Sequence, residues 1–268
     1  MLDVRAALGT HDILLITLDT LRFDVAVRAM AEGATPNLAS FFPGGWEERH
    51  TPGSFTLAAH AAFFAGFFPT PARPGRHERP FALRFEGSET TGARTAVLDA
   101  ADLPAGLAAR GYHTICIGGV GFFNLQNPLG RALPSLFAER HWRPDLGVTD
   151  PRSTENQAAL AVERIAACPP GKRLFLFVNV SALHQPNRFY VPGAQADSIE
   201  THAAALAYAD RHLPPIVTAM RRRAPLLLFV FSDHGTAYGD DGWHGHRLAH
   251  PSVWTVPYGE AVLPQLSP

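Results

Sequence analysis

Four short apolar runs, spread along the whole chain, constrain its fold more than any other feature. The runs are residues 13–18, 114–119, 174–180 and 226–232. Each is continuous rather than alternating and is rich in β-branched or aromatic residues, which is typical of strands covered on both faces. None approaches the roughly 18 apolar residues that a membrane span needs. The runs therefore predict buried strands of a parallel sheet and no membrane-spanning helix.

Helical patterns separate these runs. Residues 103–111, 154–168 and 199–223 carry apolar side chains at helical spacing, and each pattern precedes the next strand. The last pattern contains Pro214 and Pro215 and should split there, because proline interrupts helical hydrogen bonding. Alternating strands and helices predict one three-layer α/β/α domain over residues 1–268, with a mostly parallel central sheet.

The composition excludes several classes of protein. Hydrophobic residues make up 46% of the chain and charged residues 18%, and the formal net charge is −1. A folded chain of this kind has no bulk attraction for nucleic acid or membranes. The two cysteines, Cys116 and Cys168, are far apart, and the N-terminus does not resemble a signal peptide. We expect a cytoplasmic protein, whose oligomeric state the sequence leaves open.

Two segments lack a periodic pattern. Residues 69–95 are rich in Pro, Gly, Arg and Glu, and residues 122–151 are similarly irregular. Loops of this length in a compact domain are usually functional or flexible. We expect both segments to be loops.

Acidic or imidazole side chains follow three of the four predicted strands. Asp19 follows the first, His184 follows the third, and Asp233 and His234 follow the fourth. Ligands in open α/β sheets bind at the carboxyl ends of the strands, so these side chains should converge there. Carboxylate and imidazole groups bind Zn²⁺, Mn²⁺ and similar ions. The sequence therefore predicts a divalent metal site built on Asp19, Asp233 and His234.

A further ligand is available in the stretch HTPGSFTLAAHAAFFAG, residues 50–66. Thr56 stands at the start of its apolar helical pattern. A hydroxyl at a helix N-terminus lies among free N–H groups, which favour an alkoxide and a bound phosphate or sulfate. A metal ion would lower its pKa further. Thr56 is therefore a candidate nucleophile, although threonine here is also a common N-cap, and Ser54 could fill either role.

Six segments, in order along the chain, resemble motifs of the alkaline phosphatase/sulfatase superfamily, and of its sulfatase-like branch in particular. They are ILLITLDTLRFD (13–24), ATPNLASFF (34–42), TLAAHAAFFAG (56–66), LFLFVNVSALHQP (174–186), AYADRHL (207–213) and FVFSDHG (229–235). The N-terminal half is also similar to a group of small bacterial sulfatase-like proteins without an assigned reaction. The resemblance implies an alkaline-phosphatase-like fold that lacks the family's usual C-terminal subdomain.

The resemblance also gives each candidate residue a role. The catalytic positions fall on Thr56, His60, His184 and His246, and the metal-binding positions on Asp19, Thr56, Asp233, His234 and His244. His60 stands where the family signature has an arginine, and a lone histidine on an apolar helix is more often a core residue. Thr20 stands where sulfatases have a second acid, so one bound ion is easier to explain than two. The implied cofactor is Zn, Mn, Mg or Ca.

The resemblance implies a metal-dependent hydrolase of phosphate diesters, phosphonates or sulfate esters that forms a covalent intermediate on Thr56. Sulfatases convert Cys or Ser into formylglycine, a route closed to threonine. Thr56 instead resembles the nucleophile of lipoteichoic-acid synthases and phosphoethanolamine transferases. The implied partner is a small-molecule ester. Two alternatives stay open: a transferase that passes the group to an acceptor other than water, and a non-catalytic binding module.

Overall fold

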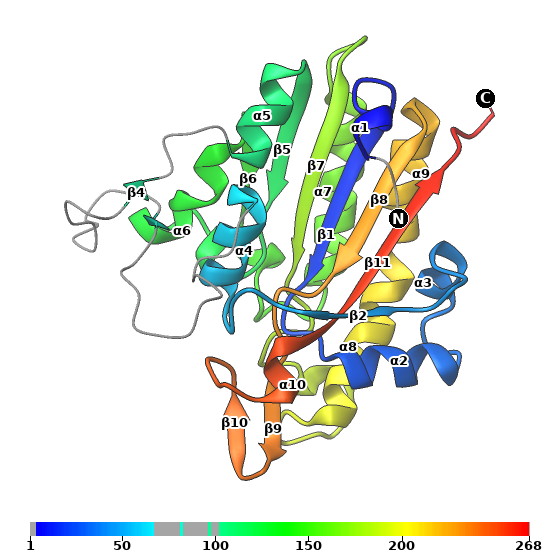
Figure 1. Ribbon diagram of the computed structural model, residues 1–268. Helices are drawn as coiled ribbons and strands as arrows, with labels where there is room; N and C mark the ends of the chain where they lie inside the picture. Colours follow the sequence, from blue (N-terminus) through cyan, green and yellow to red (C-terminus); the bar gives the residue numbers. More distant parts are fainter. Residues whose placement is uncertain (1–3, 67–80, 83–95, 98–101, 268) are drawn as a thin grey trace.

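A seven-stranded sheet forms the centre of the protein (Figure 1). The computed structural model describes residues 4–66, 81–82, 96–97 and 102–267. The strand order is β2 (Glu47–His50), β11 (Thr255–Leu263), β8 (Leu226–Phe231), β1 (Asp12–Leu18), β7 (Arg173–Val180), β5 (Tyr112–Ile117) and β6 (Glu139–His141). From β8 to β6 all neighbours are parallel, whereas β11 runs antiparallel to both β8 and β2.

The four apolar runs correspond to β1, β5, β7 and β8, so the prediction of a mostly parallel α/β sheet is confirmed. The sequence did not indicate β2, β6 or β11. All four residues of β2 are exposed and β6 has only three residues, so neither carries a readable period. The segment 122–151, predicted as a loop, instead contains β6, the short helix α6 (Pro128–Ala132) and two 3₁₀ turns, and a third 3₁₀ turn spans its start at Gly121–Phe123.

Helices cover both faces of the sheet (Figure 1). On one face lie α7 (Ser153–Ala167), α8 (Ile199–His212) and α9 (Pro214–Arg223), with α2 (Phe23–Ala31) and α3 (Pro36–Phe41) packed against α8. On the other lie α4 (Thr56–Ala65), α5 (Leu103–Ala109) and α6. The split predicted at the proline pair is confirmed, because α9 begins at Pro214.

Two short helices, α1 (Val4–Ala7) and α10 (Pro251–Trp254), lie outside the two helical layers. Two small two-stranded sheets are separate from the central sheet: β9 (Ala237–Asp240) with β10 (Trp243–Gly245), and β3 (Phe81–Ala82) with β4 (Ala96–Val97). The expected loop of residues 69–95 lies outside the described residues apart from 81–82. None of the described helices is long and apolar enough to cross a membrane.

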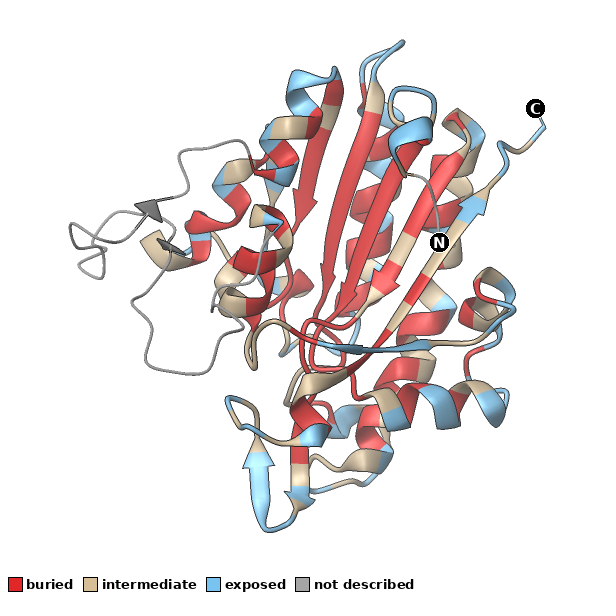
Figure 2. Cartoon of the chain, viewed as in Figure 1, coloured by how far each residue is buried: buried red, intermediate tan, exposed pale blue. Residues whose placement is uncertain are grey.

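Side chains of β1 alternate between two apolar cores. Leu14, Ile16 and Leu18 join the core formed with α7, α8 and α9, whereas Ile13 and Leu15 join the core on the opposite face. Burial of each such side chain contributes roughly 1.5–3 kcal/mol. Because both faces are covered, β1 is buried at every position, as Figure 2 shows.

The core beneath α4 and α6 is aromatic. The ring of Phe177 on β7 lies 5.3 Å from those of Phe64 and Phe123 and 5.8 Å from that of Phe137, measured between centroids. Three of these rings are at most 1% exposed, and Phe137 is 2% exposed. Edge and offset contacts between aromatic rings add to their burial energy. This packing fixes α4 over the sheet.

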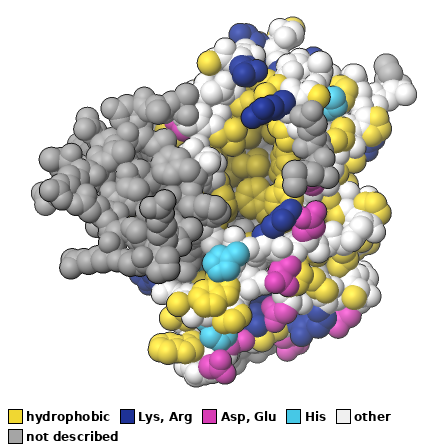
Figure 3. Space-filling view, viewed as in Figure 1, with side chains coloured by type: hydrophobic (Ala, Val, Ile, Leu, Met, Phe, Trp, Pro, Cys, Tyr) yellow, Lys and Arg dark blue, Asp and Glu magenta, His cyan; other side chains and the backbone are white. Residues whose placement is uncertain are grey.

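Beside this core, the described residues leave an apolar groove over β1, β8 and β11. It has a volume of about 510 Å³ and is lined by Ile13, Leu15, Phe229, Phe231 and Tyr258, among others. Figure 3 shows it as a hydrophobic hollow, and Figure 2 shows β8 and β11 less buried than β1.

The aromatic core predicts a large effect of Phe177→Ala on stability. Removal of a buried aromatic ring should lower the free energy of unfolding by about 3–5 kcal/mol, measured by denaturant titration. Phe189→Ala is the matched control, because Phe189 is 36% exposed; it should cost about 1 kcal/mol or less. Equal losses in the two variants would contradict the packing described.

Candidate metal centre and catalytic site

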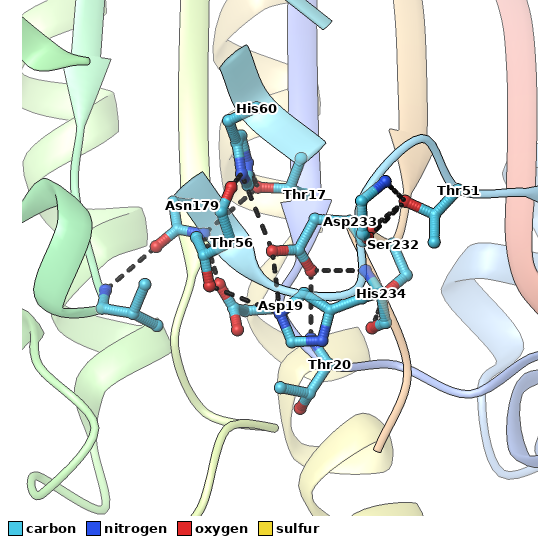
Figure 4. Close-up of polar contacts among 12 residues, drawn as sticks. Thr17, Asp19, Thr20, Thr51, Thr56, His60, Asn179, Ser232, Asp233 and His234 are labelled. Carbon is cyan, nitrogen blue, oxygen red and sulfur yellow. Dashed lines mark hydrogen bonds and ion pairs between the residues drawn. The ribbon is translucent and has the colours of Figure 1, made fainter. Parts of the chain in front are cut away.

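Two carboxylates lie together where β1 and β8 end (Figure 4). Asp19 is the first residue after β1, and Asp233 is the second after β8. Both are 0% exposed. Burial raises the pKa of Asp19 to about 7, with the nearby charge of Asp233 as the next cause, and burial likewise raises the pKa of Asp233 to about 7. The fold therefore brings two acids into a place that disfavours their charges.

Each carboxylate has one satisfied oxygen and one orphaned oxygen. Oδ1 of Asp233 accepts hydrogen bonds from the backbone N–H groups of Thr20, at 3.2 Å, and His234, at 2.9 Å. Oδ2 of Asp19 accepts one from Nδ2 of Asn179, at 3.0 Å. Oδ1 of Asp19 and Oδ2 of Asp233 are buried and have no hydrogen-bond partner among the described residues. Buried oxygens in this state are costly unless a cation or a proton neutralises them.

His234 supplies a nitrogen between these acids and α4. Its Nδ1 lies 2.8 Å from the carbonyl oxygen of Gly235 and donates to it, so the lone pair is on Nε2. Nε2 lies 3.5 Å from Oδ2 of Asp233. One ligand atom each from Asp19, Asp233 and His234 can be chosen so that all lie within 4.8 Å of one another. Two orphaned carboxylate oxygens and a free imidazole nitrogen fit a divalent ion such as Zn²⁺ or Mn²⁺.

The hydroxyl of Thr56 faces this group. Its Oγ1 lies 3.4 Å from Nε2 of His234. Thr56 is the first residue of α4 rather than its N-cap, since the capping position is Phe55, and no side chain in the described part of the protein caps that turn. The structure thus leaves the Thr56 hydroxyl outside the capping role. It points to the centre instead, beside uncapped amides of the first helical turn.

The loop before α4 is tied to the end of β8. The hydroxyl of Thr51 hydrogen-bonds to the carbonyl oxygen of Asp233. Gly53 packs directly on α4, where a Cβ atom would lie 2.5 Å from the backbone nitrogen of Ala59. The carbonyl oxygen of Ser54 accepts a hydrogen bond from the N–H of Arg247. These contacts hold the helix start beside the acids.

The turn after β1 is strained. Thr20 has a φ of +68°, a left-handed conformation that β-branched residues rarely adopt. Such a conformation costs about 1–3 kcal/mol and persists where its surroundings impose it. In return, the N–H of Thr20 points at Asp233. Thr20 therefore contributes to the site through its backbone N–H group.

His60 lies beneath the nucleophile rather than beside it. It is 0% exposed, and its ring contacts those of Phe123 and Phe177. Nδ1 lies 2.8 Å from the carbonyl oxygen of Thr56, and Nε2 lies 3.1 Å from Oγ1 of Thr17. Burial lowers its pKa to about 3. Nδ1 also lies 3.7 Å from Oδ2 of Asp233, so His60 is a buried histidine that lies under both the nucleophile and one of the acids. Its assignment to catalysis stays a prediction.

His184 and His246 line up on the other side of His234. The ring centroid of His246 lies 4.6 Å from that of His234 and 5.7 Å from that of His184. Nδ1 of His184 donates to the carbonyl oxygen of Gln185, at 2.7 Å, which leaves Nε2 free. Burial, with His234 and His184 as further causes, lowers the pKa of His246 to about 3. His244 is exposed on β10 and lies outside the cluster of ligand atoms.

Sequence reasoning did not single out three residues that shape the site: Thr17, Thr51 and Asn179. Thr17 and Asn179 are 0% exposed and lie side by side in the register of β1 and β7. Each is a polar residue within an apolar run, and that interruption was the available signal. No comparable signal marked Thr51, whose partner is a backbone atom.

The fold and this site define an α/β domain with a candidate metal centre at the carboxyl ends of its parallel strands. The family model described as Sulfatase matches residues 11–258. The chain therefore belongs to the sulfatase family, within the alkaline phosphatase superfamily. The finer resemblance to small bacterial sulfatase-like proteins stays a prediction.

Solved structures share the fold at low sequence identity. The C-terminal periplasmic domain of phosphoethanolamine transferase EptC from Campylobacter jejuni is 13% identical, with a TM-score of 0.61 over 94% of this chain and 80% of that one. The zinc complex of the C-terminal periplasmic domain of EptC from Escherichia coli is 12% identical, with a TM-score of 0.63 over 95% of this chain and 73% of that one. Lipoteichoic acid synthase LtaP from Listeria monocytogenes is 14% identical, with a TM-score of 0.60 over 95% of this chain and 66% of that one. No curated protein matches the chain in sequence.

The donor set predicts that the protein binds about one equivalent of Zn²⁺ or Mn²⁺. Asp233→Asn should abolish this binding, because it removes an orphaned ligand oxygen. Asp145→Asn is the control, since Asp145 pairs with Arg143 away from the centre. Elemental analysis of the purified protein and calorimetric titration would measure both. Unchanged binding in Asp233→Asn would contradict this centre.

Metal removal should make stability depend on pH. With both acid pKa values raised to about 7, the folded protein holds protons between about pH 4 and 7 that the unfolded chain has released. The two acids should therefore lower the free energy of unfolding of chelator-treated protein as the pH rises through this window. Buried histidines with a pKa lowered to about 3 (His60, His202 and His246) act in the opposite direction, so the wild type is compared with Asp19→Asn. In denaturant titrations at about pH 5 and about pH 8, the change in the free energy of unfolding should be more positive for Asp19→Asn than for the wild type. Equal changes in the two proteins would contradict the raised pKa values.

Proposed function

We propose that the protein is a metal-dependent enzyme that cleaves phosphate diesters or phosphonate esters with Thr56 as its nucleophile. The observation that carries the proposal is the position of the Thr56 hydroxyl, 3.4 Å from Nε2 of His234 and beside two orphaned carboxylate oxygens. A hydroxyl that only capped its helix would not face such a group.

Asp19, Asp233 and His234 are the residues that would hold the ion. When bound, the ion would lower the pKa of the Thr56 hydroxyl and neutralise negative charge on the transferred group. Thr56 would give its proton to water, and its Oγ1 would bond to phosphorus while the bond from phosphorus to the ester oxygen breaks in line; the departing oxygen would take up a proton from water. Amides of the first turn of α4 favour the developing negative charge. A water molecule would then attack phosphorus, the bond to Oγ1 of Thr56 would break, and Oγ1 would regain a proton, which restores the enzyme.

His184 and His246, which lie beside His234, could hydrogen-bond to oxygens of the substrate. Nε2 of His184 is free because Nδ1 is bonded to Gln185, and His246 lies next to His184. Either side chain can hydrogen-bond to a non-bridging oxygen or to the leaving group. We place sulfate esters last among the substrates, because a threonine cannot supply formylglycine.

A transferase of the same superfamily is the second candidate. It is favoured by the names of structural neighbours, several of which are phosphoethanolamine transferases. The same residues would form the covalent intermediate, and only the acceptor would differ. The two buried acids argue against a non-catalytic binding module, because burying carboxylate oxygens without hydrogen-bond partners lowers stability and such a module gains nothing from it. A cytoplasmic location remains a prediction from the sequence, whereas neighbours include periplasmic domains.

Thr56→Ala should stop turnover while most metal affinity remains, since the two acids and His234 are kept. We expect kcat for an aryl phosphodiester to fall by about 1,000-fold or more. Thr56→Ser keeps a hydroxyl and should retain measurable activity. Mass spectrometry of rapidly quenched wild-type protein should place the phosphoryl adduct on the peptide that contains Thr56.

A panel of nitrophenyl phosphate, phosphonate and sulfate esters, each with Zn²⁺, Mn²⁺, Mg²⁺ and Ca²⁺, tests the substrate class. Product analysis with and without acceptor alcohols separates hydrolysis from transfer. If Thr56→Ala turned over at the wild-type rate, Ser54 or water would replace Thr56, and the proposed mechanism would be wrong.

A further inference from the structure

A buried polar pair lies beneath the centre, in β1, which leads to Asp19, and in its neighbour β7. Thr17 on β1 and Asn179 on β7 are partners in the parallel register. Both are 0% exposed. Polar groups at such depth are costly unless they are hydrogen-bonded, so their partners show what they do.

The orientation of the Asn179 amide follows from its neighbours. One end lies 2.9 Å from the backbone nitrogen of Val120, which can only donate, so this end is the carbonyl Oδ1. The NH₂ group then faces the centre. Nδ2 donates to Oδ2 of Asp19 at 3.0 Å and to Oγ1 of Thr17 at 3.3 Å.

The remaining protons can then be assigned in one direction. Nδ1 of His60 lies 2.8 Å from the carbonyl oxygen of Thr56, which can only accept, so Nδ1 carries the proton and donates. Nε2 of His60 is then an acceptor, and the hydroxyl of Thr17 donates to it at 3.1 Å while Oγ1 of Thr17 accepts from Asn179. Every hydrogen bond of this chain has one donor and one acceptor (Figure 4).

The chain of bonds joins the metal-binding acid to the nucleophile. At one end, Asn179 occupies Oδ2 of Asp19 and leaves Oδ1 free to face a cation. At the other end, Nδ1 of His60 donates to the carbonyl oxygen of Thr56 in the first turn of α4, and it also lies 3.7 Å from Oδ2 of Asp233. Asn179 is itself held by the Nε2 of Gln157, which donates to its backbone carbonyl oxygen at 2.7 Å.

We infer that Asn179 and Thr17 are positioning residues with separate tasks: Asn179 orients the Asp19 carboxylate toward the metal, and Thr17, through His60, orients the nucleophile. The inference rests on the proposed function, in which Asp19 binds the ion and Thr56 attacks. Partners that orient metal ligands typically change metal affinity by about 10- to 100-fold.

The test compares nearly isosteric variants that remove each link. Asn179→Leu should raise the Kd for Zn²⁺, measured by calorimetry on the chelator-treated full chain, by about 10-fold or more. Thr17→Val keeps the bond between Asn179 and Asp19, so its Kd should stay within about threefold of wild type. Its kcat for an aryl phosphodiester should fall by about 10-fold or more with little change in KM.

Two controls separate positioning from loss of a buried polar contact. Thr114→Val removes a buried hydroxyl on the neighbouring strand β5, which accepts from the N–H of Ala138. Ser181→Ala removes a buried hydroxyl just beyond the end of β7, which bonds to the carbonyl oxygen of Leu146. Both should leave the Kd for Zn²⁺ and kcat near wild type, because neither hydroxyl bonds to a residue of the centre.

The outcomes distinguish the inference from the proposed function. A wild-type Kd in Asn179→Leu, or a kcat in Thr17→Val equal to that of Thr114→Val, would overturn the inference while the metal centre stood. Failure of the wild-type protein to bind Zn²⁺ or Mn²⁺ would overturn the proposed function itself. If Asn179→Leu does not fold, Asn179→Ser decides, since its hydroxyl is too short to reach Asp19 and should weaken Zn²⁺ binding similarly.

Discussion

The juxtaposition of Asp19 and Asp233 is the constraint on which the rest of the site depends. Adjacent parallel strands deliver the two carboxylates to one buried place, and each keeps an oxygen without a donor among the described residues. A fold gains nothing from such a pair by itself, because burial and like charge both oppose ionisation. A bound cation resolves both problems at once, and the neutral imidazole of His234 completes a donor set for it.

The aromatic core beneath α4 is in direct contact with residues that hold the candidate site. The aromatic rings around Phe177 support His60, and His60 supports the first turn of α4. The left-handed backbone of Thr20 and the close packing of Gly53 on α4 occur where the chain brings backbone groups next to the centre. The stability of the apolar core therefore offsets the cost of a precise but unfavourable polar arrangement.

Sequence reasoning succeeded where one physical cause dominates the pattern. Burial on both faces leaves an unbroken apolar run, so β1, β5, β7 and β8 were predictable, and the order of strands and helices placed Asp19, Asp233 and His234 at one edge. It could not find β2, whose exposed residues EERH carry no period. Nor could it separate His244 from His246, because the fold of the β9–β10 hairpin decides which ring turns to His234. The pairing of Thr17 with Asn179 is likewise a matter of register.

The place of β1 in the sheet bears on how the chain matures. This strand lies between β7 and β8, whose residues follow it by some one hundred and sixty and two hundred and fourteen positions in the paired register. During translation the apolar residues of β1 emerge long before β7 or β8 is made, so they stay unpaired and would benefit from binding to a chaperone. Such distant pairing slows folding. The same delay keeps Asp19 and Thr56 apart from Asp233 and His234 until β8 has been synthesised and has paired with β1, so the four residues can meet only late in folding.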